Sequence, residues 1–586
     1  MQTIQKQLTV LITLGLGIFS SLYCQEEENL GTETVTVVKA YTPTVSDAFK
    51  VKSVPVLNDS IELQKKKISY SIFSIPVAST FTPSKGKATV IQRAAPEKLY
   101  NSYAMVSFGN FGNALADFYT SRDLDRGKKR LDFGLKHHSS RGDLENVPLN
   151  TDFYNTLLSG AYTERSRDMG WTADLGFQHQ KYNWYGVEEG SLDEAIINGI
   201  EEGQNYFAAE AGARVTMDDS FFTGGDLRYR RFWDAASSGE NRFYVRPNFE
   251  FPLSTELLKV AVVFDYVGGS FENASLNSLV NSPGISYGQL QFGVSPNIEL
   301  SGDSYALSLG ASLVYGLDVE NSDSNFYIYP QVSGSYTISD NALVAYAGVE
   351  GRLVQNSYYD FVALNPYVSP TLTIQPTDQQ YDGFAGIRGQ VLTNLSYNVR
   401  ASYKAENRKP LYKLNPLNSG RTDSKGYYWG NSFEVFYDDV KTLGLFAELS
   451  ADINRSFTIG VNGEFFDYNT ETDNPAWNLP EVQGSLFFDY QIDEQWYIGA
   501  NLFFVGERND LSSEAVPNTL PQDFPSTILT LDSFFDANAY AGYRASKQLT
   551  IFAKANNIAN NDYQRWANFR VQGFQILAGA SYKFDF

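Results

Sequence analysis

The sequence predicts an all-β fold: a transmembrane antiparallel β-barrel of 22 strands, with short periplasmic turns and long extracellular loops. Three observations lead to this prediction. Apolar and polar residues alternate in segment after segment, aromatic residues make up 15% of the chain although its mean hydropathy is only -0.29, and an export signal precedes both. High aromatic content with low hydropathy is typical of a barrel with alternating faces and aromatic girdles. After the N-terminus, no apolar run reaches the roughly 20 residues that a membrane-spanning helix needs.

Residues 1–24 predict a signal peptide. Lys6 supplies a positive charge, and an apolar stretch of limited length follows over residues 8–22. The only cysteine, Cys24, lies at the junction with a polar segment. We expect cleavage after Cys24. Lipidation of Cys24 is the alternative, which bulky Tyr23 disfavours, and in either case the chain has no disulfide framework.

Residues 25–97 differ from the rest of the chain. They contain prolines at positions 43, 55, 76 and 83 and a basic run at 65–67. Prolines at this spacing interrupt strands and helices. We therefore expect an extended, partly ordered periplasmic segment.

From residue 98 onward the chain consists of alternating segments, and the last of them shows the pattern most clearly. A strand with one apolar and one mostly polar face lies between lipid and water. More than twenty such segments with no intervening helix predict a closed barrel over residues 98–586, because an open sheet of that size would leave edges. The apolar face of the last segment, which ends in the barrel's C-terminal signature Tyr582, Phe584 and Phe586, consists of Phe574, Ile576, Ala578, Ala580, Tyr582, Phe584 and Phe586.

Turn lengths allow the strands to be counted. Short turns such as 302–303 and 492–494 alternate with long stretches such as 355–378 and 406–426, and barrels of this class place short turns in the periplasm. If the region 427–453 is divided into two strands, the total is 23 strands, and the long loop 468–479 would then lie in the periplasm. Apolar residues keep one phase across this region, so one long strand and a total of 22 fit better.

Three groups of loop residues are candidate functional features. The pattern at Ser191–Glu194 matches a capping box and predicts a short helix, which orders its own loop or covers the mouth. The loop 320–325 is rich in acids and amides, but it lacks the ligand spacing of a calcium loop, so we expect a solvated turn. Aromatic residues of the loops either stack on a ligand such as a sugar or a chelate, or anchor the barrel at the membrane interface. They include Tyr358, Tyr359, Tyr412, Tyr427, Tyr428 and Trp429.

Candidate chemistry is sparse. The three histidines, His137, His138 and His179, have no nucleophile–base or metal-ligand pattern around them, so we expect no enzyme activity and no cofactor or metal. Neighbouring His137 and His138 should point to opposite faces of their strand. The net charge of -21 and the absence of a Lys/Arg cluster argue against a nucleic-acid partner.

One predicted strand carries the charges Asp226, Arg228 and Arg230. We expect them to face the lumen, because a charge on the lipid face costs about 2–4 kcal/mol at mid-depth. They form a lumenal salt-bridge lattice, or they bind a solute or a plug-like segment.

Three features together resemble the TonB-dependent receptor family. The stretch from Leu549 to Phe586 is similar to that family's final hairpin, with Asn556-Asn557-Ile558, then Tyr563, and Gly573 opening the last strand. The expected 22 strands match the family's barrel. Near the mature N-terminus, a segment is similar to the TonB box: Thr34, Val35, Thr36, Val37, Val38, Lys39 and Ala40.

The resemblance implies a Gram-negative outer-membrane protein in contact with lipid, with a role in nutrient uptake and with TonB as a partner. The family's plug domain has well over a hundred residues, whereas only residues 25–97 precede the barrel here. Two functions follow. One is a receptor-like transporter in which 25–97 act as a minimal plug. The alternative is a plugless structural barrel that serves as scaffold or partner in an outer-membrane assembly, with another outer-membrane or periplasmic protein.

Overall fold

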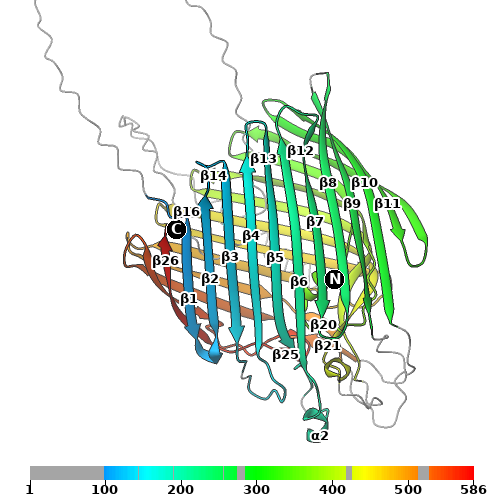
Figure 1. Ribbon diagram of the computed structural model, residues 1–586, viewed down its shortest axis with the longest axis vertical. Coiled ribbons are helices and arrows are strands. Elements are labelled where there is room, and N and C mark those ends of the chain that lie inside the picture. The colour runs from blue at the N-terminus through cyan, green and yellow to red at the C-terminus, as the bar shows by residue number, and fades with distance from the viewer. Residues whose placement is uncertain are drawn as a thin grey trace, which may run out of the picture. The chain divides into compact units, whose positions relative to one another are not determined.

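A computed structural model describes residues 98–585, apart from 143, 189, 255, 273–283, 418–424 and 513–526 (Figure 1). The predicted signal peptide with Cys24, the segment 25–97 with its TonB-box-like residues 34–40, and Phe586 lie outside the described residues. The barrel belongs to a compact unit that spans Ala95–Phe586.

Twenty-two strands form one antiparallel sheet that closes on itself, because the first strand pairs with both the second and the last. The predicted barrel and its strand count are therefore confirmed. In Figure 1 the last strand, in red, lies beside the first, in blue. The strands are β1 (Ser102–Gly109), β2 (Ala114–Asp123), β3 (Lys129–Ser140), β4 (Phe153–Arg165), β5 (Met169–Asn183), β6 (Gly203–Met217), β7 (Phe222–Asp234), β8 (Gly239–Leu253), β9 (Glu256–Phe271), β10 (Ile285–Ser301), β11 (Tyr305–Asp318), β12 (Asp323–Ser339), β13 (Leu343–Val354), β14 (Thr377–Leu392), β15 (Leu395–Leu414), β16 (Phe433–Asn454), β17 (Phe457–Thr470), β18 (Val482–Gln491), β19 (Trp496–Val505), β22 (Phe534–Arg544), β23 (Leu549–Asn556) and β26 (Gln575–Phe584).

The remaining elements belong to the connections. Among the described residues, no helix is long and apolar enough to cross a membrane. These elements are the helices η1 (Asn110–Gly112), α2 (Glu194–Ile197), α3 (Tyr358–Leu364) and η2 (Gly426–Tyr428), the hairpin of β20 (Arg508–Ser512) with β21 (Thr527–Leu531), and the hairpin of β24 (Gln564–Trp566) with β25 (Phe569–Arg570).

The two faces of the strands differ as the alternation predicts. On β11, Leu307, Leu309 and Leu313 are exposed on the outer face. Between them Ser308 and Ser312 face inward, where the Ser312 hydroxyl accepts a hydrogen bond from Ser295 (2.8 Å) and the Ser308 hydroxyl accepts one from Asn297 (2.8 Å). Outside the barrel the exposed apolar side chains form an outer surface of the kind that membrane barrels present to lipid.

The C-terminal strand follows the same rule. Ile576 and Tyr582 are about half exposed on the outer face of β26, whereas Leu577 points inward and is 2% exposed. The rings of Tyr582 and Phe584 stack 6.1 Å apart. Tyr582 and Phe584 therefore lie on the outer side of the seam with β1.

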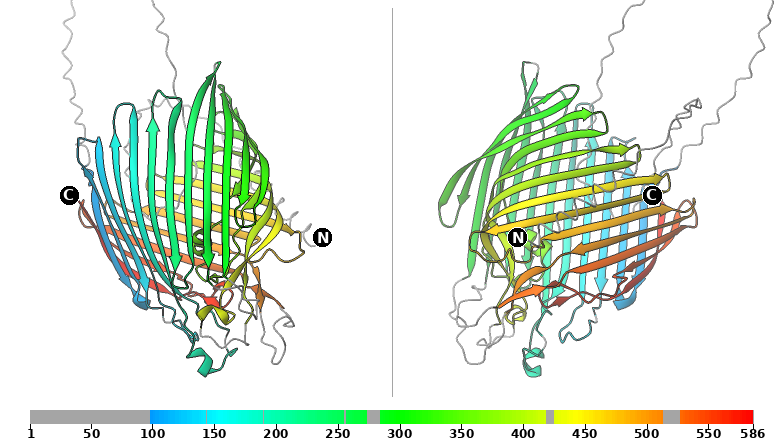
Figure 2. Two further views of the ribbon diagram at one scale, coloured as in Figure 1. Left: turned by 45° about the vertical axis from the view of Figure 1, so that its right-hand side comes forward. Right: turned by 180° about the vertical axis from the view of Figure 1, so that it is seen from behind.

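The region 427–453 contains a single long strand, as the turn parity predicts. β16 has 22 residues and pairs with the 20-residue β15 on both sides of Asp438-Asp439. Asp438 and Asp439, which suggest a turn by composition, lie opposite a bulge in β15. At this bulge Arg408 has a φ of 53°, and its backbone N–H donates to Asp439 Oδ1 (2.7 Å). Figure 2 shows the wall from two further sides, with these strands slanting across it.

The outer face generates the first prediction. Leu309→Arg would place a guanidinium group against lipid in the middle of β11, and we expect it to lower the free energy of unfolding by about 2–4 kcal/mol. Urea unfolding of the protein reconstituted in lipid vesicles measures this.

Ser308→Arg is the matched control, because the same side chain then points into the lumen. Its expected cost is about 1 kcal/mol, from the lost hydrogen bond with Asn297. Equal destabilisation by both substitutions would contradict the assignment of the two faces.

Candidate binding site at the extracellular mouth

The loop between β13 and β14, residues 355–376, folds inward and carries the helix α3. Its sequence explains where the helix begins, because the Ser357 hydroxyl accepts a hydrogen bond from the backbone N–H of Asp360 (3.1 Å). The same hydroxyl donates to the Asp360 carboxylate (2.6 Å). Asn365 and Pro366 end the helix, since the residue before a proline avoids helical dihedral angles. The result is a two-turn helix whose first turn presents both backbone N–H groups and a carboxylate.

Aromatic side chains hold α3 against the inner wall. The ring of Tyr358, which is fully buried, lies 4.9 Å from that of Phe271 on β9 and 5.1 Å from that of Phe232 on β7. The hydroxyl of Tyr206 on β6 donates to the carbonyl of Pro366 (2.8 Å), just after the helix. Burial and the neighbouring carboxylate of Asp234 raise the pKa of Tyr358 well above its usual value. Its hydroxyl therefore stays protonated and donates to Asp234 (2.8 Å).

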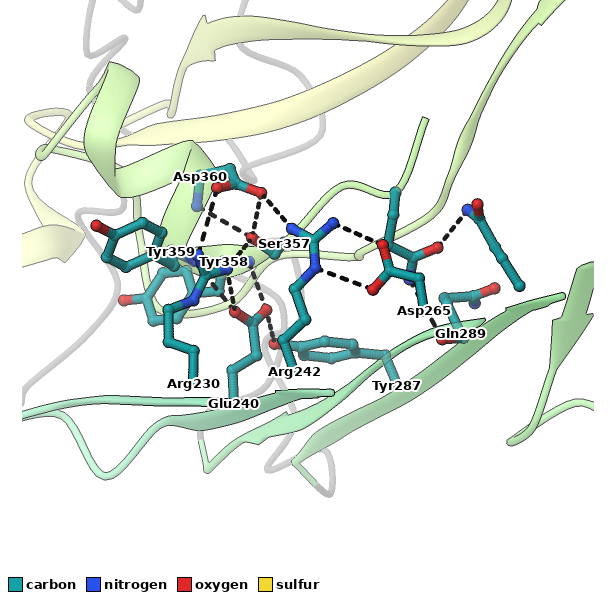
Figure 3. A network of polar contacts seen from close by, with 12 residues as sticks. Arg230, Glu240, Arg242, Asp265, Tyr287, Gln289, Ser357, Tyr358, Tyr359 and Asp360 are labelled. Atoms are coloured by element: carbon teal, nitrogen blue, oxygen red, sulfur yellow. Dashed lines mark hydrogen bonds and ion pairs between the residues drawn. The ribbon is translucent and has the colours of Figure 1, made fainter. Parts of the chain in front are cut away.

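A buried carboxylate on the wall receives the start of the helix (Figure 3). Glu240 on β8 is 1% exposed and accepts hydrogen bonds from the backbone N–H groups of Tyr358 (2.6 Å) and Tyr359 (3.4 Å). It also accepts one from the hydroxyl of Tyr287 on β10 (2.8 Å). Because a buried carboxylate is costly unless it is hydrogen-bonded and paired, loop and wall depend on each other here.

Two arginines on adjacent strands complete this network. Arg230 on β7 and Arg242 on β8 are direct cross-strand neighbours. Their positive charges repel each other unless nearby carboxylates compensate them. Arg242 forms a bidentate pair with Asp265 on β9 (2.7 and 3.0 Å) and reaches Asp360 of α3 (3.2 Å). Arg230 donates to Ser357 (3.1 Å), and its guanidinium lies 3.9 Å from the ring centre of Tyr359. The wall therefore binds the loop through charge as well as through aromatic packing.

Most of the loop aromatics that the sequence analysis singled out are neither ligand-stacking nor interface residues. They pack against one another in a buried cluster at the loop-bearing end of the barrel, where Trp184 and Tyr427 meet edge to face at 5.1 Å. The expectation of an exposed role is therefore wrong for five of the six, and only Tyr359 lines a cavity. The five buried residues are Tyr358, Tyr412, Tyr427, Tyr428 and Trp429.

A cavity of about 620 Å³ lies beside α3, at the extracellular end of the lumen. Its wall combines β3–β5 with the strands and loop near the C-terminus, from β22 to β26. Gln178 and Gln180 come from β5, Tyr359 and Tyr367 from the inward loop, and Trp566 from the loop 557–574. Ligand pockets typically have volumes of about 300–1,000 Å³ and combine apolar surface with a few polar groups. This cavity is the candidate binding site.

The predicted lumenal charges lie in different surroundings. Arg230 joins the network with α3, whereas Asp226 pairs with Arg214 on β6 (2.6 Å). Arg228 has no ion pair with any residue that the structure describes. Sequence reasoning missed Glu240, Arg242, Asp265 and Asp360, although charges at alternate positions of β8 signal a second polar lumenal face.

The histidines lie where strand geometry places them. His137 on the outer face is hydrogen-bonded to the Thr156 hydroxyl (2.8 Å), whereas His138 faces inward against Phe153 and lines the cavity. His179 stacks on Phe207 at 4.3 Å. Within the described ranges, no group of three or more His, Cys, Asp or Glu side chains is arranged to hold a metal ion.

The two other loop predictions differ in outcome. A short helix does form, but α2 begins at Glu194 after Asp193, and no side chain caps it. The capping-box assignment to Ser191 is therefore wrong, because the Ser191 hydroxyl donates to the carbonyl of Glu188 instead (2.6 Å). The expected solvated turn at 320–325 forms only in its first half, where the N–H groups of Glu320 and Asn321 donate to Asp318, because residues 323–325 already belong to β12.

An extracellular hairpin contains a second buried carboxylate. Asp510 on β20 accepts hydrogen bonds from the backbone N–H of Leu414 (2.8 Å), from the side chain of Asn478 (2.7 Å) and from the backbone N–H of Leu511 (2.7 Å). Burial is the largest influence and raises the pKa of Asp510 to about 6. This carboxylate joins the top of β15 to the loop 471–481 and to the hairpin.

Comparison with known proteins identifies the fold. No family model and no curated protein matches the sequence. Among solved structures, the siderophore receptor PirA from Acinetobacter baumannii has a TM-score of 0.62 at 12% identity, covering 83% of this chain and 81% of that one. The ferripyoverdine receptor of the outer membrane of Pseudomonas aeruginosa gives 0.59 at 13% identity, with 84% and 73% covered. The copper transporter OprC gives 0.58 at 12% identity, with 84% and 82% covered.

These similarities concern the fold, since all the identities are far below 25%. The chain has the 22-stranded barrel fold of the TonB-dependent receptors, so the resemblance inferred from the sequence is confirmed at that level.

Docking of the loop generates the second prediction. Glu240→Ala removes the acceptor of two backbone N–H groups and leaves Arg230 without its nearest wall carboxylate. We expect amide hydrogen exchange in residues 357–365 to accelerate about 5-fold to 150-fold, since leaving a buried group unsatisfied costs about 1–3 kcal/mol and 1.4 kcal/mol is a factor of ten. Hydrogen-exchange mass spectrometry measures this.

Glu240→Gln should have a smaller effect, because its amide oxygen still accepts hydrogen bonds. Glu350→Ala is the control: Glu350 is an exposed carboxylate of β13 with no partner among the described residues. Unchanged protection in Glu240→Ala would contradict the role of this network.

Asp510 generates a prediction about pH. Its pKa is raised in the folded protein, so the fold favours the protonated acid: the hairpin gains stability as pH falls from about 6 towards the ordinary value near 3.8, and it bears the cost of a buried charge above pH 6. In Asp510→Asn this part of the pH dependence should vanish. The substitution should cost about one hydrogen bond, roughly 0.5–1.5 kcal/mol, because the Asn478 amide must flip to accept from the new N–H group and then no longer donates to the Tyr412 carbonyl.

Limited proteolysis of the loop 506–533 between pH 4 and 7 compares the two proteins. Asp532→Asn, on an exposed acid of the same loop, is the control. Identical pH profiles of wild type and Asp510→Asn would refute the assignment.

Proposed function

We propose that this receptor-like outer-membrane barrel takes up a nutrient across the outer membrane and draws on TonB for energy. The observation that carries the proposal is the cavity at the extracellular end of the lumen, bordered by a loop that is folded inward and bound to the wall. A cavity of about 620 Å³ lined by polar and aromatic side chains has the size and lining of a ligand site. The named functions of PirA and OprC, a siderophore receptor and a copper transporter, agree with uptake.

Residues 34–40 are the proposed contact with TonB, and residues 25–97 the proposed minimal plug. An extended segment rich in β-prone residues can add a strand to an exposed sheet edge of a partner. Such pairing depends on backbone hydrogen bonds, so a short sequence is sufficient for it.

Site-specific photo-crosslinking tests the TonB contact in living cells. A benzophenone amino acid at Val37 should give a covalent adduct with TonB, and the same group at Val56, outside the proposed box, should not. Deletion of residues 34–40 should then impair growth in nutrient-limited culture as much as loss of the whole protein. Absence of the adduct at Val37, or equal adducts at both positions, would exclude TonB coupling through this segment.

The alternative remains a scaffold in an outer-membrane assembly. It predicts a stable complex after purification in mild detergent, unaffected by deletion of residues 34–40. The receptor is supported if the protein purifies as a monomer and deletion of residues 34–40 impairs growth in nutrient-limited culture. The scaffold is supported if the protein purifies in a stable complex and the deletion leaves growth unchanged.

A further inference from the structure

The cavity beside α3 has an unusual chemical character for a protein with a net charge of -21. Ten of its lining side chains are primary amides and nine are aromatic, so these two kinds dominate the wall. Its two carboxylates, Asp152 and Asp536, equal its two guanidinium groups, Arg565 and Arg570, in number. The lining therefore has no net formal charge.

Several of the charged groups are also engaged with protein partners. Asp152 pairs with Lys181 (2.7 Å), Arg570 pairs with Asp562 (2.7 Å), and Asp536 accepts a hydrogen bond from the Tyr563 hydroxyl (3.0 Å). A ligand in this cavity thus meets neutral polar groups more than free charge.

The amides on the β5 side are held in place with hydrogen-bonding capacity to spare. Gln178 donates to Asn155 (3.0 Å) and accepts from the Tyr359 hydroxyl (3.3 Å). A primary amide has two N–H donors and an oxygen with two lone pairs, so each of these contacts leaves capacity unused. The side chain of Gln180, two residues along the same strand face, has no hydrogen bond to any described residue.

A second row of amides lines the opposite wall. Gln575 donates to Gln572 (2.9 Å) and accepts from Asn556 (3.3 Å), and Gln572 in turn donates to Ser140 (2.7 Å). The row runs from β23 and β26 through Gln572 to Ser140 at the end of β3. Two fixed rows of mixed donors and acceptors therefore border the cavity.

The aromatic rings are fixed by stacking. Tyr367 and Phe569 stack at 3.9 Å, and Phe153 and Tyr182 lie nearly parallel at 6.1 Å. Trp566 is held by edge contact with Tyr412 (5.2 Å). Such pairs restrain ring orientation, so the cavity offers preformed flat apolar surfaces next to the amides.

We propose that this cavity binds a neutral oligosaccharide. The inference rests on the proposed uptake function and names its substrate class. Each sugar hydroxyl is both donor and acceptor, as a primary amide is, and the C–H faces of a sugar ring pack on the electron-rich faces of aromatic rings. The balanced charge of the lining favours a ligand without net charge.

Other ligand classes fit less well. A bare metal ion has no cluster of His, Cys, Asp or Glu ligands among the described residues. A peptide bound by strand addition needs an unpaired sheet edge, whereas the barrel strands of this wall are paired on both sides in the closed sheet. The hairpin of β24 and β25 does have free edges, but its strands have only three and two residues.

Binding to the purified full-length protein in detergent tests the proposal. The probes are an array of neutral and acidic oligosaccharides, a random hexapeptide mixture and ferric citrate. We expect retention of a neutral oligosaccharide, with a dissociation constant raised about 3-fold to 10-fold by Gln180→Leu, as the loss of a hydrogen bond implies, and by at least as much in Trp566→Leu.

Gln495→Leu and Trp496→Leu are matched controls, because both residues lie at the short turn between β18 and β19, away from the loop-bearing end. Neither should change binding. Retention of the peptides or ferric citrate instead, retention of no probe, or sugar binding that survives both cavity substitutions would overturn the proposal. The crosslink at Val37 does not depend on ligand class, so failure here leaves the TonB proposal to be judged by its own result.

Discussion

Backbone hydrogen bonding in lipid is the constraint on which this structure depends. Hydrocarbon offers no partner to an N–H or C=O group, so a membrane-spanning sheet must close on itself. The closure joins β1 to β26, in register from Ser102 with Phe584 to Gly109 with Leu577. At this seam a Cβ on Gly109 would lie 2.3 Å from the carbonyl oxygen of Ile576, so only glycine permits the approach. Closure then assigns every side chain to lipid or to lumen.

A closed barrel of this width creates a second problem, because its interior is too large for wall side chains alone to fill. In the described part of the chain, the loop 355–376 occupies one region of the mouth. Its attachment uses groups that would be costly if left alone: Glu240 is buried, and Arg230 lies directly across from Arg242. Removing one partner from such a network leaves a buried charge uncompensated. Any other position of the loop would therefore be costly, so the network fixes where the loop binds even if it adds little net stability.

The barrel was predictable because apolar and polar residues alternate between the two faces of each strand. Each alternating segment can be recognised in the sequence, so the strands can be counted. At Asp438-Asp439 the local composition suggests a turn, but the alternation of short and long connections requires a continuous strand. The structure has that strand, and Asp439 accepts a hydrogen bond from the bulge residue Arg408.

The candidate site was not predictable in the same way. Tyr358 and Glu240 are 118 positions apart, and nothing local in a sequence indicates which wall a loop will contact. Arg230 was singled out as a charge, yet its loop partners Ser357 and Asp360 required the tertiary structure.

Enclosure of the candidate cavity links ligand affinity to loop docking. Tyr359 and Tyr367 form part of its wall only while α3 is bound to β6–β10, so the undocked state lacks part of the site. The apparent dissociation constant equals the intrinsic one divided by the docked fraction, so a fraction of about one half costs a factor of two and a fraction of about one hundredth costs a hundredfold. Asp360 does not line the cavity, but its ion pairs with Arg230 and Arg242 help to hold the loop, so a change in these ion pairs should change the apparent affinity through the docked fraction. Under the proposed uptake function, the contacts that dock α3 on the wall also set the strength with which the cavity binds its ligand.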